Sequence, residues 1–410
     1  MILAAPYRPK ALMNVSLKNV WQRLAIATNW PVLLAVAVLS ILGITSIWAA
    51  SRPDGIKQCI FLAVAIGCLG LFQAVNYQKI GRLAWAFYLL SLLLVFYTVL
   101  GNFAEAHHHA LPGVHTTHGV CAWINFGPIS LEPAELMKIA FVLVLARYLR
   151  YRNNYRTLRG LVAPFALALT PLILILKQPD LGMAMLFLPV LFSMLFVAGA
   201  KIKHLVMIVF SGLLLAPVVW FSGSKQVPVL RHFPAIIKPY QRERMQAFLD
   251  ADNPAERQRK AYQTYRAMVA FASGSLAGKG HGKIPIGQSV PEAHNDMIFA
   301  LIGEQFGFVG ALTMLLAYLI LFTAGATIAS NTREPFGRLI AVGIVATLAC
   351  QSFINISVCT GLMPVTGITL PFVSYGGSSM VASFMAAGLL LNVGQNRPLV
   401  MARESFEFNA

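Results

Sequence analysis

The sequence has few charged residues, and acidic residues are the scarcer kind. Only 11% of its 410 residues are Asp, Glu, Lys or Arg, and 57% are hydrophobic, with a mean hydropathy of +0.68. Soluble globular proteins carry roughly 25% charged residues. So few charges cannot cover the surface of the roughly two or three soluble domains that the length alone would suggest. The composition predicts a polytopic membrane protein and excludes a disordered chain, a collagen-like fibre and a disulfide-rich secreted scaffold.

Cysteine is also scarce, and no CxxC spacing occurs. Neither a structural zinc site nor a disulfide framework is therefore indicated by the five cysteines, which are Cys59, Cys68, Cys121, Cys350 and Cys359. A P-loop, a dinucleotide-binding GxGxxG, an HExxH and a nucleophile elbow are all missing. The net charge of +17 does not indicate nucleic acid, because basic loops are expected in a membrane protein from its topology and from anionic lipid headgroups.

Long apolar runs predict an all-α fold with about ten transmembrane helices. Each run has about 20 mostly apolar residues, the length that one membrane crossing needs. The first follows a polar lead of 30 residues, so we do not expect a cleaved signal peptide. The eighth is long for one crossing and is expected to be tilted or to extend beyond the bilayer. The runs are 31–50, 57–76, 82–100, 133–149, 160–176, 181–200, 203–221, 296–328, 336–358 and 377–395.

The distribution of Lys and Arg orients these helices. Basic residues gather in the lead and in alternate links, while the opposite links carry almost none, so the positive-inside rule places both termini in the cytoplasm. We expect a cytoplasmic segment 1–30, a single transmembrane domain 31–395 and a cytoplasmic tail 396–410. The connection 222–295, between helices 7 and 8, is then a large extracytoplasmic loop. Its parts 239–250 and 261–273 mix Arg with apolar residues and could form short interfacial helices.

Unusual polar residues converge on one face of this topology. They come from four links that all join an odd-numbered helix to the next even-numbered one, as an active site or a binding cleft at that face would require. These residues are Trp123, Glu132 and Glu135; Lys177, Gln178 and Asp180; His294 and Asp296; and Ser374, Tyr375, Gly376, Gly377, Ser378 and Ser379. Lys138 and Glu304 are the exceptions, because they lie deeper in the helices.

Two interpretations stay open for each ionisable residue. Glu135 and Lys138, three residues apart, form either an intrahelical ion pair or part of a catalytic site. Glu304 lies about 12 Å along the helix from Asp296, so we expect it to be hydrogen bonded or neutral and chiefly structural. Asp296 lies where a hydrated loop meets the membrane, which favours either a base of raised pKa or a helix N-cap. Asp180 has the same two alternatives.

Two further clusters have a simple and a more specific interpretation. The run 374–379 could present backbone N–H groups to an anion, or it could make a tight turn. Five histidines crowd one outward loop and could bind a metal, although a solvated loop tip explains them as well; they are His107, His108, His109, His115 and His118.

Several blocks resemble one known family in order and spacing. Residues 291–299, which read PEAHNDMIF and are followed by Gly303-Glu304, resemble the PEAHTDFIF…GEE signature of the SEDS family (shape, elongation, division and sporulation proteins). Lys177–Gly182, Gly361–Gly367 and Leu370–Ser379 match three more blocks of that family, and Tyr262-Gln263 with Gly278-Lys279-Gly280 fits its loop segment. The resemblance covers about 300 residues and agrees with the ten-helix topology.

The resemblance implies a peptidoglycan glycosyltransferase of the RodA/FtsW type. Such a protein polymerises lipid II into a growing glycan strand at the outer face of the bacterial cytoplasmic membrane, beside a class B penicillin-binding protein. The resemblance also implies that Asp296 is the catalytic base of an inverting transfer from an undecaprenyl-pyrophosphate-linked donor. Lys177, the basic loop or a divalent cation (Mg or Mn, ligands unknown) would stabilise the diphosphate. The other motif residues, with Lys138, Lys279, Glu292 and His294, would bind substrate or support the site.

The blocks also depart from the family pattern and leave alternatives. Ala122-Trp123-Ile124 lacks the family's arginine, His294-Asn295-Asp296 replaces HTD, and Arg266 stands where a glutamine is usual. These changes suggest a divergent member. The motifs favour an elongation (RodA-like) role slightly over a division (FtsW-like) one. A lipid-linked precursor flippase and a non-catalytic scaffold that activates a penicillin-binding protein are the alternatives, and the gathering of charges at one face favours chemistry over translocation.

Overall fold

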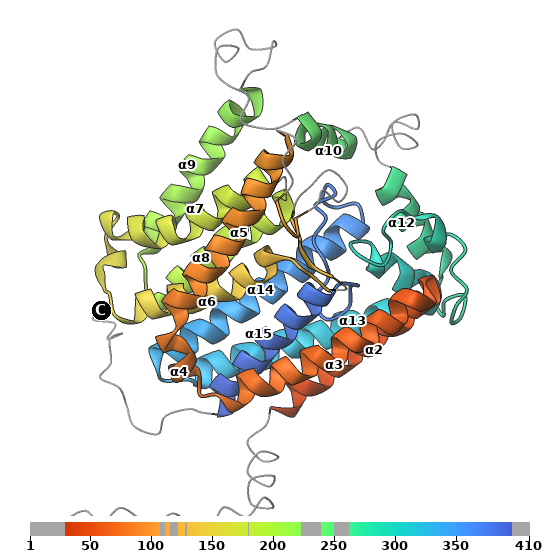
Figure 1. Ribbon diagram of the computed structural model, residues 1–410, viewed down its shortest axis with the longest axis horizontal. Coiled ribbons are helices and arrows are strands. Elements are labelled where there is room, and N and C mark those ends of the chain that lie inside the picture. The colour runs from red at the N-terminus through yellow and green to blue at the C-terminus, as the bar shows by residue number, and fades with distance from the viewer. Residues whose placement is uncertain are drawn as a thin grey trace, which may run out of the picture.

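The computed structural model describes residues 29–106, 111–114, 122–127, 129–178, 180–222, 239–249 and 262–395. These residues form a bundle of helices with one small antiparallel hairpin, in which Ile124 pairs with Leu131 (Figure 1). The elements are α2 (Trp30–Ala50), α3 (Arg52–Ala74), α4 (Tyr77–Arg82), α5 (Ala84–Ala106), β1 (Ile124–Phe126), β2 (Ile129–Leu131), α6 (Pro133–Arg150), η1 (Asn154–Arg156), η2 (Arg159–Leu161), α7 (Val162–Lys177), α8 (Leu181–Ala198), α9 (Ile202–Phe221), α10 (Pro239–Leu249), α12 (Tyr262–Ser273), η4 (Gly287–Ser289), α13 (Ile298–Asn331), α14 (Pro335–Cys359) and α15 (Gly377–Gln395).

Nine helices in the described ranges are long and apolar enough to cross a membrane. The predicted run that is not among these nine is 133–149, which forms α6 and carries four charged residues within 18 positions: Glu135, Lys138, Arg147 and Arg150. At 1.5 Å per residue it is about 27 Å long, close to the roughly 30 Å thickness of a bilayer core. The predicted all-α polytopic membrane fold is confirmed. The side on which the termini lie stays a prediction, and the histidine loop and both terminal segments fall outside the described residues.

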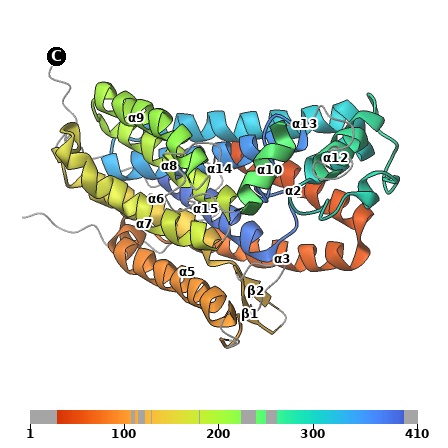
Figure 2. The same ribbon diagram turned by 90° about the horizontal axis from the view of Figure 1, so that it is seen from above.

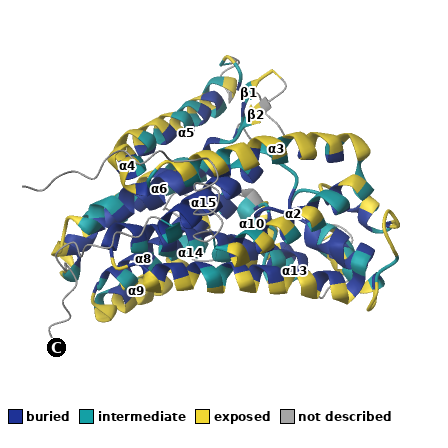
Figure 3. Cartoon of the chain, turned by 90° about the horizontal axis from the view of Figure 1, so that it is seen from below, coloured by how far each residue is buried: buried dark blue, intermediate teal, exposed yellow. Residues whose placement is uncertain are grey.

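The most buried helices lie in the middle of the bundle. α6 and α15 are buried along most of their length, and α8 and α14 pack beside them. α5 and the hairpin lie on one side of this central group, and α9 and α13 lie on the other (Figure 2). The outward faces of α3, α5, α9 and α13 are exposed and apolar, whereas the centre is buried (Figure 3). This is the pattern that a bundle surrounded by lipid requires.

A single buried amide closes the end of α3. The Asn392 side chain in α15 donates to the carbonyls of Phe72, Gln73 and Val75, and its oxygen accepts from the backbone N–H of Tyr77 at 3.0 Å. The last carbonyls of a helix have no partner within the helix, so Asn392 satisfies groups that lipid could not. It also fixes the turn from α3 into α4.

The long helix α13 is broken at Gly307, whose φ of 64° and ψ of −159° interrupt the helix. The preceding loop replaces the lost hydrogen bonds, and its Gly278, with φ of 81°, touches the break so closely that a Cβ there would lie 2.2 Å from the Gln305 oxygen. The replacement bonds run from Lys279 N to Glu304 O, Gly280 N to Gln305 O, Phe308 N to Ser275 O and Val309 N to Leu276 O, at 2.9–3.1 Å. The 296–328 run therefore forms two helical segments, which the expectation of one tilted span did not include.

The loop 222–295 contains helices at both predicted places. α10 is joined to the end of α9 by Arg242, whose guanidinium donates to the carbonyls of Trp220 and Ser222. α12 packs against α13 and η4, and buries Ala267 and Ala270. The loop is thereby anchored to the bundle from α12 onward, which places it over the head of α13.

The contact between α3 and α15 depends on a residue without a side chain. A Cβ at Gly388 would lie 2.6 Å from the Leu69 carbonyl oxygen, so the two backbones would have to separate. We predict that Gly388→Ala lowers the free energy of unfolding by about 1–3 kcal/mol. Gly70→Ala in α3 is the matched control, because nothing lies within 4 Å of the added atom. Thermal unfolding in detergent measures both, and equal stability of the two variants would contradict the packing described.

Candidate active site

Asp296 lies at the end of the long loop, two residues before α13, and is only 9% exposed. Its carboxylate Oδ1 accepts a hydrogen bond from Gln263 Nε2 of α12 at 3.3 Å. Its backbone carbonyl accepts from the Asn355 side chain of α14 at 2.8 Å and lies 3.4 Å from Cys359 Sγ. The N-cap position of α13 is Met297 and has no side-chain cap, so the alternative role of Asp296 as the N-cap is not observed.

The surroundings of Asp296 make its charged form costly. Burial raises the pKa of its carboxyl group to about 6, and the nearby negative charge of Glu292 acts in the same direction. A hydrogen bond from its own backbone N–H and the positive charge of Arg244 oppose this rise. A carboxylate with a pKa near 6 is largely ionised at neutral pH and yet basic enough to accept a proton.

The turn 374–376 lies directly against the Asp296 segment. The backbone N–H of Tyr375 donates to the His294 carbonyl at 2.9 Å, and the Tyr375 and His294 rings meet edge to face at 5.3 Å. Ser374 Oγ donates to the Asn295 carbonyl and accepts from Leu370 N. Gln58 of α3 brackets the turn, since it donates to the Ser374 carbonyl and accepts from the Gly376 N–H. The N–H groups of Tyr375 and Gly376 are thus bonded within the protein, so residues 374–376 form a tight turn, and anion binding by the rest of the run stays a prediction.

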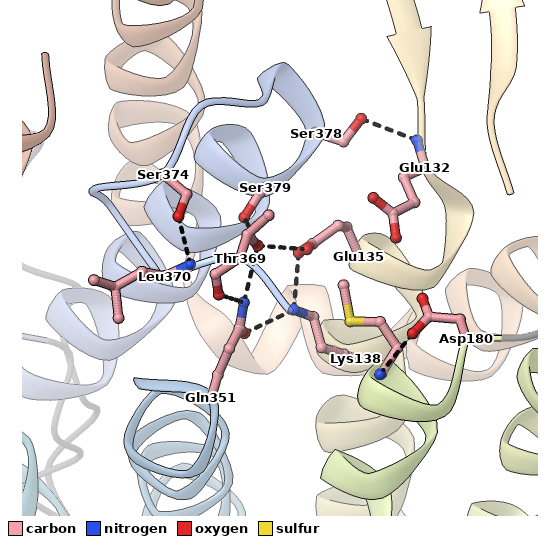
Figure 4. A network of polar contacts seen from close by, with 11 residues as sticks. Glu132, Glu135, Lys138, Asp180, Gln351, Thr369, Leu370, Ser374, Ser378 and Ser379 are labelled. Carbon is pink, nitrogen blue, oxygen red and sulfur yellow. Dashed lines mark hydrogen bonds and ion pairs between the residues drawn. The ribbon is translucent and has the colours of Figure 1, made fainter. Parts of the chain in front are cut away.

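A connected polar network lies at the head of α6 (Figure 4). Lys138 Nζ lies 2.9 Å from Glu135 Oε2 and donates to Gln351 Oε1 at 2.8 Å. Gln351 donates to the Thr369 carbonyl, and the Thr369 hydroxyl is bonded to Ser379 at 2.7 Å. Glu135 and Lys138 are almost completely buried, so the pairing that the sequence spacing allowed is what makes their burial tolerable.

Two more carboxylates border this network. Asp180 Oδ1 accepts from Met183 N at 2.9 Å and so caps α8. Burial nevertheless raises the pKa of Asp180 to about 6, and the positive charges of Lys138 and Arg244 oppose that rise. Burial, with the negative charges of Glu135 and Asp180, also raises the pKa of Glu132, whose backbone N–H is held by Ser378 Oγ at 2.9 Å.

Arg244 connects the two parts of the site electrostatically. It belongs to α10, is exposed, and donates to the Val365 carbonyl at 3.2 Å. Its positive charge opposes the rise in pKa that burial causes in both Asp180 and Asp296. One exposed guanidinium thus acts on two carboxylates that come from different loops, one buried (Asp296) and one partly buried (Asp180).

The remaining predicted residues do not all join this cluster. Gln178 donates to the Val95 carbonyl and the Thr98 hydroxyl, which fixes the end of α7 to α5. Lys177 is exposed, and Trp123 hydrogen bonds to the Glu132 carboxyl group. Lys279 pairs with Glu304 at 2.6 Å, away from Asp296.

Glu304 acts as the anchor of the loop before α13. Its two carboxylate oxygens accept from Lys279 Nζ and from the backbone N–H groups of Ile286 and Gly287, at 2.6–3.1 Å. With this many donors, the structural role expected for Glu304 accounts fully for its geometry.

A divalent cation finds no prepared site in the described part of the chain. None of the described His, Cys, Asp and Glu residues gather in groups of three or more that could hold a metal ion. The network around Glu135 already uses its oxygens for Lys138 and Thr369. The described residues therefore do not fit a resident metal, and the expected cation stays a prediction.

Sequence reasoning passed over the amides that hold the site together. Gln351 and Asn355 are four residues apart in an apolar helix, which places both on one face. Gln58 lies near the head of α3, directly after Lys57, and all three amides are buried. A buried amide in a membrane helix must find partners inside the protein, so this spacing was a usable signal. Arg244 gave no such signal, because arginine is common throughout its loop.

The fold and the site together define a polytopic helical membrane protein with a buried carboxylate at the junction of a loop and a membrane helix. The model of the FtsW/RodA/SpoVE family, described as "Cell cycle protein", matches residues 16–398. The chain belongs to this family.

Several relatives and solved structures are similar over almost the whole chain. Stage V sporulation protein E of Bacillus subtilis is 33% identical, over 88% of this chain and 94% of that protein. The probable peptidoglycan glycosyltransferase FtsW of Geobacter metallireducens is 31% identical, over 88% and 93%. Peptidoglycan glycosyltransferase MrdB of Escherichia coli is 28% identical, over 94% and 98%.

Among solved structures, a chain from a study entitled "Structural coordination of polymerization and crosslinking by a peptidoglycan synthase complex" superposes with a TM-score of 0.75. It is 28% identical and covers 92% of this chain and 100% of its own. The rod shape determining protein RodA of Thermus thermophilus gives a TM-score of 0.63 at 26% identity, over 91% and 98%. The relatives carry both RodA-type and FtsW-type names, so the elongation role stays a prediction.

The raised pKa of Asp296 predicts a stability cost at neutral pH. The folded protein holds this proton more tightly than the unfolded chain does, so stability falls as pH rises from about 4 to about 6 and stays lower above that. Asp296→Asn removes the buried charge and should raise the free energy of unfolding at pH 8 by up to about 3 kcal/mol. Near pH 4 the difference should vanish.

Thermal unfolding of both forms at pH 8 and at pH 4 measures this effect. Asp54→Asn is the control, because Asp54 is partly exposed and paired with Lys57 at 3.5 Å, and it should give no stabilisation at pH 8. An Asp296→Asn protein no more stable than wild type at pH 8 would contradict the burial of a charged carboxylate.

Proposed function

We propose that this protein is a peptidoglycan glycosyltransferase that polymerises lipid II at the outer face of the cytoplasmic membrane. The observation that carries the proposal is Asp296 itself. It is a buried carboxylate with a pKa near 6, at the boundary between a polar loop and a membrane helix, in a chain of the FtsW/RodA/SpoVE family. Names of its relatives support the same activity. A substrate with a lipid tail can reach a site at this boundary while its tail stays in the membrane.

In the proposed reaction Asp296 is the general base. It accepts the proton of the acceptor sugar hydroxyl as that oxygen attacks the anomeric carbon of the donor. The new C–O bond forms as the bond from carbon to the diphosphate oxygen breaks, so the configuration inverts and undecaprenyl diphosphate leaves. Gln263 orients the carboxylate through Oδ1, and Asn355 fixes the backbone behind it.

The departing diphosphate needs positive charge. Arg244 is the described cation that acts on both Asp180 and Asp296, and it is exposed to the side from which substrate would enter. A guanidinium can hold two phosphate oxygens at once, which suits it to a diphosphate. We assign Arg244 to the leaving group, with Lys177 as a second exposed cation near the head of α8.

A class B penicillin-binding protein is the proposed partner. The similar chain from a peptidoglycan synthase complex supports this assignment. Polymerised strands need cross-linking, so a transpeptidase held beside the polymerase would receive its product directly.

The direct test is lipid II polymerisation by the purified protein with its cognate transpeptidase, with Mg²⁺ or Mn²⁺ present. We expect glycan ladders from wild type and at least a 100-fold lower rate from Asp296→Asn, the scale of losing a general base. Asp180→Asn is the matched control, because Asn retains the capping oxygen of α8 and should leave measurable activity. Equal rates from wild type and Asp296→Asn would remove Asp296 as the base. No polymer from a stable wild-type complex would favour the scaffold or the flippase.

The assignment of Arg244 predicts a change in pH dependence. Removing its positive charge raises the pKa of Asp296, so the acid limb of the kcat/KM profile, expected near pH 6, should move to higher pH in Arg244→Gln. Activity at neutral pH should fall as well. Arg242→Gln is the control: it loosens α10 from α9 but should leave the acid limb in place. An unshifted limb in Arg244→Gln would refute the assignment.

A further inference from the structure

A cavity of about 470 Å³ lies at the end of the bundle away from Asp296. It is bounded by α4, the last turn of α6 and the first turn of α14, and α4 lies far from α10 and α12 (Figure 1). Along α6, Arg147 is 12 residues beyond Glu135, or about 18 Å. The cavity is therefore separate from the candidate active site. We call it the basic pocket; its lining includes Lys79, Arg82, Arg147, Arg150, Tyr151 and Phe336.

Positive charge in the basic pocket exceeds negative charge. Glu334 is the carboxylate that the described residues bring to it, and it pairs with Arg150 at 3.2 Å while also capping α14 through Gly337 N. Arg147 donates to the Gly81 carbonyl. Lys79 and Arg82 are exposed and form no ion pair with any described residue. Among the described residues, four cationic side chains therefore surround one carboxylate, and the excess positive charge favours the binding of an anion.

The guanidinium of Arg150 is held in place by aromatic rings. Its central carbon lies 5.2 Å from the Tyr151 ring centre and 5.8 Å from that of Phe336. Its Nε is paired with Glu334, and stacking of this kind leaves the Nη groups at the edge of the guanidinium available to an oxyanion. Arg147 is oriented by its bond to Gly81. Two prepositioned guanidinium groups suit a phosphate better than they suit a single carboxylate.

The setting of the pocket indicates a lipid as the source of that phosphate. Leu83 and Tyr151 beside the basic residues are 67% and 64% exposed, so apolar and cationic groups adjoin at the ends of membrane helices. The links that form the pocket are among those that the positive-inside rule assigns to the cytoplasm. The cytoplasmic leaflet is enriched in anionic phospholipids, and basic pockets between membrane helices on the cytoplasmic side bind the headgroups of such lipids.

We propose that the basic pocket binds the phosphodiester headgroup of an anionic phospholipid. Arg147 and Arg150 hold the phosphate oxygens, Lys79 and Arg82 add long-range attraction, and the acyl chains lie against the exposed apolar residues alongside. The bound lipid would link α4 to α6 and α14 at the end of the bundle opposite to Asp296. The proposal does not depend on the proposed glycosyltransferase activity.

Native mass spectrometry of the full protein in mixed micelles tests the proposal. The micelles contain equimolar phosphatidylglycerol and phosphatidylcholine. We expect wild type to retain phosphatidylglycerol preferentially, and the double variant Lys79→Gln with Arg82→Gln to lose about fivefold in affinity for each charge removed. Both side chains are exposed and unpaired among the described residues, so the variant should fold. The control double variant, Arg159→Gln with Arg333→Gln, removes the same charge from exposed positions outside the pocket and should keep the preference.

A second arm separates lipid from free phosphate. Inorganic phosphate at millimolar concentration should neither displace phosphatidylglycerol nor raise the melting temperature as that lipid does. Stabilisation by phosphate alone would overturn the lipid assignment. Equal losses in the two double variants would mean attraction by general surface charge, and no loss in either would mean that the pocket does not bind the headgroup; both results would refute the proposal.

Discussion

The position of the candidate base depends on one buried amide. Asn355 donates from a single nitrogen to the Asp296 carbonyl at 2.8 Å and to the Ile368 carbonyl at 2.7 Å. It thereby ties the segment before α13 to the segment before α15, two non-helical stretches that enter the bundle. Backbone that is not helical is tolerated at such depth only if its polar groups are satisfied by protein. Gln351, one turn earlier on the same face of α14, does the same for Thr369 and extends the support to Lys138 and Glu135.

The same need for internal partners explains which features could be read from the sequence. Apolar runs predict the helices because each must span about 30 Å. Most of the predicted ends lie within three residues of the observed ones, and the two largest differences are at the start of α3 and at the end of α5. The convergence of Glu135, Asp180, Asp296 and the 374–379 turn followed from topology alone. The break at Gly307 did not, since it requires hydrogen bonds from the loop residues 275–280, which only the folded chain brings together. The influence of Arg244 on Asp180 and Asp296 could not be predicted from the sequence either, because nothing distinguishes this arginine from the other basic residues of its loop.

Burial raises the pKa of Asp296, and this both makes its carboxylate a stronger base and lowers the stability of the folded protein at neutral pH. A pKa near 6 makes the carboxyl group a usable base at neutral pH, where it is charged inside the protein. Gln263 donates to the carboxylate itself, whereas Asn355 bonds the Asp296 backbone carbonyl and Gln58 fixes the neighbouring turn, so that the charged group is held in position. Glu135 is handled differently: it is neutralised by Lys138 at 2.9 Å, as fits a group that supports the helices rather than exchanging a proton.

The two ends of α6 differ in how the charged side chains around them are balanced. At its head Glu135 is paired with Lys138, and the positive charge of Arg244 acts on Asp180 beside them. At its foot Arg147 and Arg150 join Lys79 and Arg82 around one carboxylate, and the excess faces a cavity. A closed network keeps its members in fixed places, whereas the positive charge around the basic pocket exceeds the negative charge that the described residues supply there. Helix α6 has too many charges to resemble an ordinary membrane span, and these two ends are the reason.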